Sequence, residues 1–283
     1  VSLCRDKDWH PALYQVLQNN ITYYRQAGFR VLHIGDEAIV DLHNFTLAGK
    51  RFKHLRNTIS RFQREGFQTL WYDPPLDDHL LRRLRYVSDD WLLHQGGEEK
   101  ALSLGWFEME LIRNTPVVTV EDNQNNILAF ANYVPMFKLD QASPDLMRYS
   151  RQAPAGIMDY LFIESILHYK ELGVAEFNLG LAPLAHVGRE ESSTLAEKAI
   201  NLLYQNFYNF KGLHDFKAKF QPHWEPRYLI YPGLVVLPRV SLAVVRADNP
   251  TGFNKFLHLA INRGKVRLPY GFTVNTDLQN KHS

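Results

Sequence analysis

The sequence contains a single cysteine, Cys4, in 283 residues. One cysteine excludes an internal disulfide framework and a zinc site built from several cysteines, so we expect a reducing compartment. No apolar run approaches the roughly 18 residues that a membrane-spanning helix needs, and no signal peptide is visible. Charge of one sign is also scarce, because the net charge is only +2. A nucleic-acid-binding function therefore has to be argued from local clusters of charge.

The composition is otherwise that of an ordinary globular protein, with 45% apolar and 22% charged residues. A chain of 283 residues is long enough to bury a sizeable core, in one large domain or two smaller ones. The chain begins inside sequence that has the pattern of a structured segment. We therefore expect it to be a fragment of a longer protein.

Apolar periodicity and turn residues predict a mixed α/β (α+β) fold. Residues 145–162, DLMRYSRQAPAGIMDYLF, combine an apolar strand, a tight Pro/Gly turn and an amphipathic helix. The predicted elements are strand, helix and strand over 10–42, a helix over 49–67, a strand over 67–73, a helix over 76–95, a hairpin over 116–136 with its turn at 122–126, a strand over 145–150, a helix over 156–173, a strand over 175–182, a helix over 193–207, a strand over 227–232 and a helix over 251–264.

A weak internal repeat relates residues 23–35 to residues 168–180. Both segments run from an aromatic and basic helix end through a glycine into an apolar strand that ends in glycine. The repeat indicates a duplicated α/β unit. Chance is the alternative, because helix, glycine and strand often follow one another.

The order of elements from 116 to 232 resembles the GNAT acyltransferase fold. In ordinary GNAT enzymes the turn before the main helix binds the pyrophosphate of coenzyme A through main-chain N–H groups. Here the turn reads RQAPAGI (151–157), with Pro154 in place of the first loop glycine. Proline has no N–H to offer a phosphate. The turn therefore argues against coenzyme A, and we expect no cofactor.

Four longer motifs resemble the soluble domain of the multiple peptide resistance factor family, the aminoacyl-phosphatidylglycerol synthases. They lie at residues 38–67, 145–162, 177–188 and 207–232. The resemblance covers about residues 10 to 240 and implies tandem GNAT-like folds joined by a basic helix. The expected division is the end of a first GNAT-like unit in 1–49, the connecting helix in 50–66 and a second, catalytic unit in 67–283. The family also implies a preceding transmembrane domain and a place at the cytoplasmic face of the bacterial membrane.

The activity that the resemblance implies is transfer of an aminoacyl group from aminoacyl-tRNA to a glycerol hydroxyl of phosphatidylglycerol in an anionic membrane. Lysyl-tRNA is expected as donor rather than alanyl-tRNA. The cationic lipid product connects the family with antibiotic resistance. Two alternatives stay open: a peptidoglycan-bridge aminoacyltransferase, which also uses aminoacyl-tRNA, and a non-catalytic module that binds tRNA or membrane.

The reaction is a transesterification, which is helped by a base, by donors at the oxyanion and by firm placement of both substrates. It requires no metal, and the twelve histidines show no HExxH spacing. The resemblance makes Asp145 and Arg148 catalytic. In a regular strand these two side chains point to opposite faces, so they converge only if the strand ends or bulges between them. A salt bridge at the strand end is the alternative interpretation.

Further candidates supply charge and stacking surfaces. Lys219 is expected to stabilise negative charge at the ester, and Glu108 is a candidate carboxylate near the amino acid. Interleaved cations and aromatics in 216–228 suit phosphate contact and stacking on an unpaired tRNA end; a basic surface loop is the alternative. The candidate substrate-binding residues are Tyr149, Asp159, Glu190, Lys217, Trp224 and Arg227. For Asp159, a favourable interaction with the helix N-terminus is the alternative role.

The basic helix is the candidate contact for the tRNA acceptor stem. Six cations stand against one acid, Glu65, over about 16 residues, whereas the whole chain is nearly neutral. An A-form stem would be bound through phosphates and shape. A solvated helix face is the alternative. The six residues are Lys50, Arg51, Lys53, Arg56, Arg61 and Arg64.

Overall fold

The computed structural model of the chain describes residues 2–94, 106–134, 136, 140–183 and 210–248. The predicted helices over 193–207 and 251–264 lie outside these residues. The helices are α1 (Ser2–Asp6), α2 (Ile21–Gln26), α3 (Lys53–Arg64), α4 (Asp78–His94), α5 (Met109–Arg113), α6 (Ile157–Glu171), α8 (Phe210–Ala218) and α9 (Leu237–Asp248). The strands are β1 (Leu13–Leu17), β2 (Arg30–Asp41), β3 (Gln68–Tyr72), β4 (Val117–Glu121), β5 (Ile127–Val134), β6 (Gln141–Tyr149), β7 (Glu176–Pro183) and β8 (His223–Tyr231).

One sheet of eight strands runs through the molecule in the order β1-β8-β2-β7-β6-β5-β4-β3. Neighbouring strands pair antiparallel except β6 and β7. These two pair in parallel, Gln141 with Glu176 and Ala142 with Phe177. Beyond that short ladder β6 continues along β5, while β7 continues along β2. The predicted mixed α/β fold is confirmed. The division of the chain into units at 49/50 and 66/67 stays a prediction. It would place β2 in the first unit and β7 and β8 in the second.

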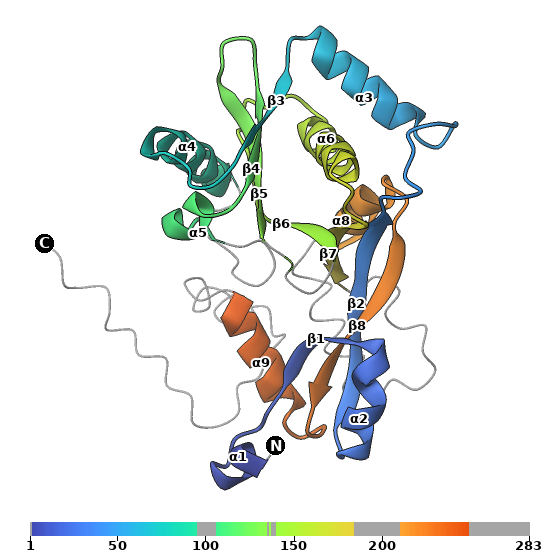
Figure 1. The fold of residues 1–283 in the computed structure, drawn as a ribbon. Helices are drawn as coiled ribbons and strands as arrows, with labels where there is room; N and C mark the ends of the chain where they lie inside the picture. The colour runs from blue at the N-terminus through green and yellow to red at the C-terminus, as the bar shows by residue number, and fades with distance from the viewer. Residues whose placement is uncertain (1, 95–105, 135, 137–139, 184–209, 249–283) are drawn as a thin grey trace, which may run out of the picture.

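Helices cover both faces of the sheet (Figure 1). On one face, α3 and α6 bury an apolar cluster that includes Leu55, Phe62 and Tyr160. Phe62 stacks on Tyr160 with ring centroids 4.8 Å apart, a kind of pair worth about 0.5–1.5 kcal/mol beyond area burial. On the other face, α4 packs its leucines against Phe130 and Leu146. The apolar stripe predicted for α3 is therefore confirmed.

The hairpin turn is confirmed as predicted. The Asp122 carboxylate accepts hydrogen bonds from the main-chain N–H groups of Gln124 at 2.9 Å and Asn126 at 2.8 Å. Asn125 takes a positive φ of 61°, a conformation that asparagine tolerates better than most residues. The aspartate thereby substitutes for main-chain acceptors and fixes the register of β4 and β5.

Helix α3 is shorter than predicted, because it begins at Lys53 rather than at Gly49. The Arg56 side chain donates to the carbonyl oxygen of Gly49, at 2.8 Å, and to that of Leu47. These contacts hold the preceding chain as a loop against the first turn of the helix. The Arg56 side chain lies seven residues beyond Gly49 and nine beyond Leu47, and the apolar periodicity of the helix gives no signal of these contacts.

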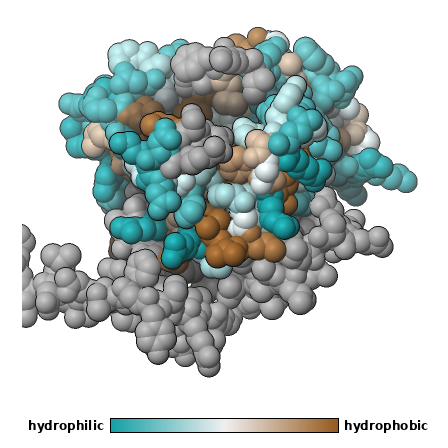
Figure 2. Space-filling model, turned by 90° about the horizontal axis from the view of Figure 1, so that it is seen from below, coloured by the Kyte–Doolittle hydropathy of each residue, from teal (hydrophilic) through white to brown (hydrophobic). Residues whose placement is uncertain are grey.

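Two helices were not anticipated from the sequence, α8 and α9. The end of helix α8 overlaps the start of segment 216–228, for which a basic surface loop was one interpretation, and Phe216 and Phe220 contact Phe162 of α6. Helix α9 buries Leu237 and Val240 against the β2–β8 part of the sheet. Both are stabilised by tertiary packing of their apolar faces. Seen from below, the described surface is mostly hydrophilic, with small hydrophobic areas between (Figure 2).

Candidate functional site

A bulge in β6 brings Asp145 and Arg148 within each other's influence. Tyr133 of β5 pairs with Pro144 and Ala131 pairs with Met147, so two residues of β6 oppose the single residue between them. That residue, Asn132, accepts a hydrogen bond from the main-chain N–H of Leu146 at 2.8 Å, and its side-chain NH2 donates to Thr115 Oγ1 at 3.2 Å. A bulge of this kind re-aims side chains. The bulge therefore allows the Asp145 and Arg148 side chains to converge, which a regular strand would not.

Arg148 is wholly buried. Its guanidinium carbon lies 4.1 Å from the ring centroid of Trp91 in α4, and Nη1 donates to the Met147 carbonyl oxygen at 3.0 Å. Arginine stays charged when buried, so this position holds a permanent cation inside the protein. A buried, oriented guanidinium is suited to bind a phosphate or a developing oxyanion.

Asp145 is partly buried beside this cation. Burial raises the pKa of the Asp145 carboxyl, although the hydrogen bond from Asn132 and the charge of Arg148 act to lower it. A carboxyl with a raised pKa holds and releases a proton closer to neutral pH than an ordinary aspartate does. The pair therefore combines a fixed cation with a tunable proton acceptor.

The main-chain N–H groups of the turn after β6 are already hydrogen-bonded within the protein. The Asp90 carboxylate of α4 accepts from the Arg151 main-chain N–H at 2.7 Å, while Gln152 and Ala153 donate to the side-chain and main-chain oxygens of Ser150 at 3.2 and 3.0 Å. Residue 154 is proline and has no N–H. In this described turn, residues 151–154 thus leave no main-chain donor for a pyrophosphate.

A second polar cluster lies at the start of α6, on the face of the sheet that α3 and α8 cover. Both Asp159 carboxylate oxygens accept from Lys219 Nζ, at 2.8 and 2.9 Å. His54 Nε2 of α3 lies 3.5 Å from the same carboxylate. The Asp159 side chain is buried, and that of Lys219 is 37% exposed. The structure therefore pairs two residues for which the sequence predicted separate roles.

A third cluster joins β2, β7 and β8. Lys217 Nζ donates to the carbonyl oxygens of Gly180 at 2.9 Å and Leu181 at 2.7 Å. Burial lowers the pKa of Lys217 to about 7, with Glu37 acting in the opposite direction. Arg227 is buried and pairs with Glu37 and with Glu225, the latter at 3.0 Å. In the described structure Lys217 thus ties α8 to β7, and Arg227 ties β8 to β2.

The remaining candidates are dispersed. Trp224 stacks on His214 with centroids 4.6 Å apart, and Tyr149 packs partly buried against the α3–α6 core. Glu108 is exposed just before α5 and accepts from Trp106 Nε1 at 3.2 Å. Glu190 lies outside the described residues.

The six basic residues of the connecting segment divide into two groups. Arg56 of α3 packs, partly buried, against the loop that precedes the helix. Arg61 is partly buried where it donates to the Ala155 carbonyl oxygen of the turn before α6. Main-chain carbonyl oxygens already bind these two side chains, those of Leu47 and Gly49 for Arg56 and that of Ala155 for Arg61. The tRNA contact stays a prediction for all six. The exposed group is Lys50, Arg51, Lys53 and Arg64.

The side chains of these clusters that sequence reasoning missed include His54, Asp90, Trp91 and Asn132. Each contributes through a contact with a residue far away in the chain. The bulge at Asp145 was the one feature that the sequence posed as a condition, and Asn132 is the residue that stabilises it.

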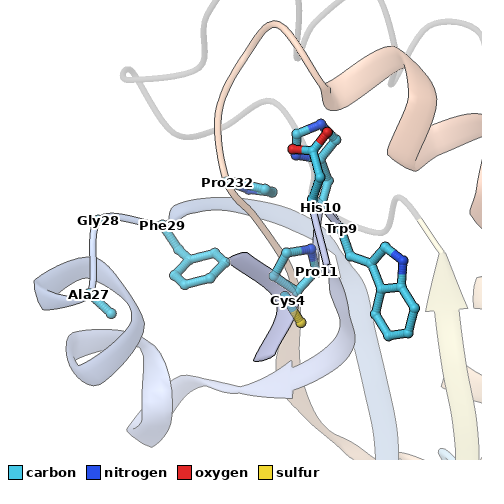
Figure 3. A pocket seen from close by; sticks show the side chains of 9 residues that line it. Cys4, Trp9, His10, Pro11, Ala27, Gly28, Phe29 and Pro232 are labelled. Carbon is cyan, nitrogen blue, oxygen red and sulfur yellow. The ribbon is translucent and has the colours of Figure 1, made fainter. Parts of the chain in front are cut away.

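A pocket of about 340 Å³ opens at the N-terminal end of the chain (Figure 3). None of the candidate site residues lines it. Its residues are Cys4, Asp8, Trp9, His10, Pro11, Ala27, Gly28, Phe29 and Pro232. The pocket is therefore separate from the three polar clusters.

Two kinds of feature are absent from the described residues. Histidine, cysteine, aspartate and glutamate side chains form no group of three or more there that could hold a metal ion. Among the helices described, none combines the length and the apolar character required to cross a membrane.

A family model described as "Phosphatidylglycerol lysyltransferase, C-terminal" matches residues 1–231. A phosphatidylglycerol lysyltransferase of Bacillus subtilis (strain 168) is 39% identical over 228 residues, which make up 80% of this chain and 26% of that relative. The chain therefore spans about a quarter of that protein's length.

Two solved structures have a similar fold. The structure of L-PGS from Bacillus licheniformis superposes with a TM-score of 0.79 at 37% identity, covering 87% of this chain and 75% of that one. The C-terminal domain of a putative lysylphosphatidylglycerol synthetase from Agrobacterium fabrum gives 0.76 at 35% identity, with 87% and 77% covered.

Proposed function

The chain belongs to the family of phosphatidylglycerol lysyltransferase C-terminal domains, and from this premise we propose that it transfers a lysyl group to a glycerol hydroxyl of phosphatidylglycerol. We propose lysyl-tRNA as the donor. The preference for lysine over alanine is supported by the names of its relatives, which are lysyltransferases. The resemblance to the multiple peptide resistance factor family is confirmed by the same findings.

The bulge in β6 is the observation that carries this proposal. It lies inside the matched residues 1–231 and sets Asp145 beside the buried guanidinium of Arg148. A structural strand-end salt bridge does not require the cation to be wholly buried. An anionic group that entered this site would find a preformed partner in Arg148.

In the proposed reaction the glycerol oxygen attacks the ester carbonyl carbon of lysyl-tRNA. The new C–O bond forms as the bond to the ribose 3′ oxygen breaks, and the proton of the glycerol hydroxyl ends on that ribose oxygen. Arg148 binds a phosphate or the carbonyl oxygen, and Asp145 orients it or holds the aminoacyl ammonium. Lys219, fixed by Asp159, adds positive charge on the opposite face. No metal is assigned a role.

The two substrates are proposed to approach from opposite faces of the sheet. The exposed cations Lys50, Arg51, Lys53 and Arg64 lie on and before α3, on the same face as the Asp159–Lys219 pair. They suit the phosphates of a tRNA acceptor stem. Arg148 lies on the α4 face, from which the lipid headgroup is proposed to enter. The strands β6 and β7 diverge between the two faces.

We propose that the reaction takes place at the cytoplasmic face of a bacterial membrane, where aminoacyl-tRNA and phosphatidylglycerol meet. A membrane-spanning part of the same polypeptide, which the family resemblance implied, would hold the domain at that surface. Both statements concern the whole protein, of which this chain matches about a quarter in its relatives.

The test is a transfer assay with the purified chain. Vesicles of phosphatidylglycerol are mixed with tRNA that carries labelled lysine or labelled alanine, and the label in the lipid extract is counted. The expected result is lysine label in lipid, little alanine label, and none with vesicles of phosphatidylethanolamine alone. Alanine label in excess would contradict the assigned donor. No label from either tRNA, with the chain folded, would contradict the proposed acceptor.

A further inference from the structure

We propose that Asp90 and Trp91, consecutive residues of α4, are positioning residues that hold Arg148 and the turn after β6 in the geometry that transfer requires. The inference rests on the proposed function, because it assigns these residues to the site of that reaction. Neither side chain is proposed to touch the reacting atoms.

Trp91 fixes the plane of the Arg148 guanidinium. The indole is 8% exposed and the arginine is wholly buried, with the guanidinium carbon 4.1 Å from the ring centroid. A guanidinium stacked on an aromatic face is held both by the cation–π attraction and by its own planarity. Its N–H donors then lie in one fixed plane, and one of them is already directed at the Met147 carbonyl oxygen.

Asp90 fixes the segment that directly follows Arg148. One carboxylate oxygen accepts from Ser150 Oγ at 2.9 Å and from the Arg151 N–H at 2.7 Å, and the other accepts from Arg151 Nε at 2.7 Å. Burial acts to raise the pKa of Asp90, but the hydrogen bonds from Arg151 and Ser150 outweigh it and lower that pKa. The carboxylate is therefore ionised and bound in place at neutral pH.

The two contacts act together because one helix supplies both. Leu84 and Val87, on the preceding turns of α4, are buried in the cluster that also contains Leu146 of β6. The helix is thus anchored to the same strand that carries Asp145 and Arg148. A displacement of α4 would move the guanidinium and the turn at once. This juxtaposition is more than packing requires, since a leucine at position 91 would fill an apolar gap without orienting a cation.

The first test compares substitutions of Trp91 in the lipid-transfer assay. Trp91→Leu is expected to lower kcat by about 10²-fold, as misplacement of a reacting group by about 1 Å does, with little change in KM for lysyl-tRNA. Trp91→Phe keeps an aromatic face and is expected to retain most of the activity. Tyr86→Leu, which removes a 74% exposed ring from the same helix, is the matched control and is expected to leave kcat unchanged.

The second test asks whether Trp91 acts through Arg148. Arg148→Lys keeps a cation but loses the planar guanidinium. If Trp91 only orients that guanidinium, the double variant Trp91→Leu/Arg148→Lys should be little less active than Arg148→Lys alone. The two losses of activity would then not add. Additive losses would overturn the inference and leave Trp91 as a packing residue. Should Trp91→Leu lower the melting temperature, the same cycle is run at a temperature well below the melting transition of every variant.

Asp90→Asn gives an independent arm, with Asp89→Asn as its control. Asp89 is the neighbouring aspartate, half exposed and paired only along the helix with Arg85 in the contacts described. We expect lower kcat for Asp90→Asn alone. If Arg148→Lys is impaired while Trp91→Leu and Asp90→Asn match the wild type, the positioning role is overturned and the proposed function stands. If Arg148→Lys and Arg148→Ala both transfer at the wild-type rate, the role of Arg148 fails and the positioning role fails with it. If the wild-type chain itself transfers no lysine to the lipid, the proposed function fails.

Discussion

Among the described residues three cations are buried, Arg148 and Arg227 in the sheet and Lys217 in α8, and each needs a different form of compensation. Burying a charge costs several kcal/mol unless partners offset it. Arg227 has two glutamates and Arg148 has an indole face and a nearby carboxyl. Lys217 has two carbonyl oxygens and the more distant Glu37. At the residue scale, Lys217 is therefore the buried cation whose partners offset the cost of burying its charge least.

Lys217 should make stability depend on pH above neutrality. Burial lowers its pKa to about 7 from the ordinary 10.5. Below about pH 7 it is charged in both the folded and the unfolded state, so the cost of burial is fully present. Between these two pKa values the unfolded state binds more protons, and the free energy of unfolding rises with pH. The expected rise is on the order of a few kcal/mol.

Urea unfolding at pH 7 and at pH 10 measures this effect. Lys217→Met should remove the rise, whereas Lys53→Met, at an exposed position of α3, should preserve it. An equal rise in wild type and Lys217→Met would show that the lysine is charged in the folded protein.

At the scale of elements, the turn between β6 and α6 is built from three directions. Asp90 of α4 binds its start, Pro154 shapes its middle and Arg61 of α3 donates to the carbonyl oxygen of Ala155. Gly156 follows with a φ of +86°, and a Cβ there would lie 3.1 Å from Arg61 Nη2. The glycine is required twice, once by the backbone conformation and once by the arginine that packs on it.

Gly156→Ala should therefore destabilise the protein more than a comparable glycine substitution. Gly173 is the matched control, because its φ is +80° and a Cβ there would meet nothing within 4 Å. Gly173→Ala should cost about 1–2 kcal/mol from the left-handed conformation alone. Gly156→Ala should cost that amount plus the displacement of Arg61. Thermal unfolding of both variants checks the difference, and equal losses would mean that the Arg61 contact contributes nothing.

The elements themselves were largely predictable, and the contacts between them were not. Periodicity and turn residues located the hairpin, α3, α4, α6 and the strands around them, since those signals are local. The start of α3 differs from expectation because Arg56 binds the carbonyl oxygens of the preceding segment and holds it as a loop. Helices α8 and α9 depend on burial against segments far away in sequence. The pattern of residues shows which faces are apolar but not which partner covers them.

At the scale of the whole molecule, the sheet separates two sets of candidate residues. Asp145 and Arg148 depend on α4 and on the β6 bulge, whereas Asp159 and Lys219 lie beside α3. The family resemblance identified members of both sets from the sequence. Their separation by the sheet, and the commitment of Lys217 and Arg227 to strand contacts, required the structure. An arrangement of this kind suits a transfer between two large substrates that must not occupy the same surface.

The measurement that tests the account most directly is lysine transfer into phosphatidylglycerol by Arg148→Ala. The variant is compared with wild type and with Arg82→Ala, which removes an exposed arginine from α4. The melting temperature and tRNA binding of all three proteins are measured first and must agree. The account predicts that lysine label disappears from the lipid extract for Arg148→Ala and is unchanged for Arg82→Ala. Undiminished transfer by Arg148→Ala would contradict the assignment of the chemistry to the β6 bulge.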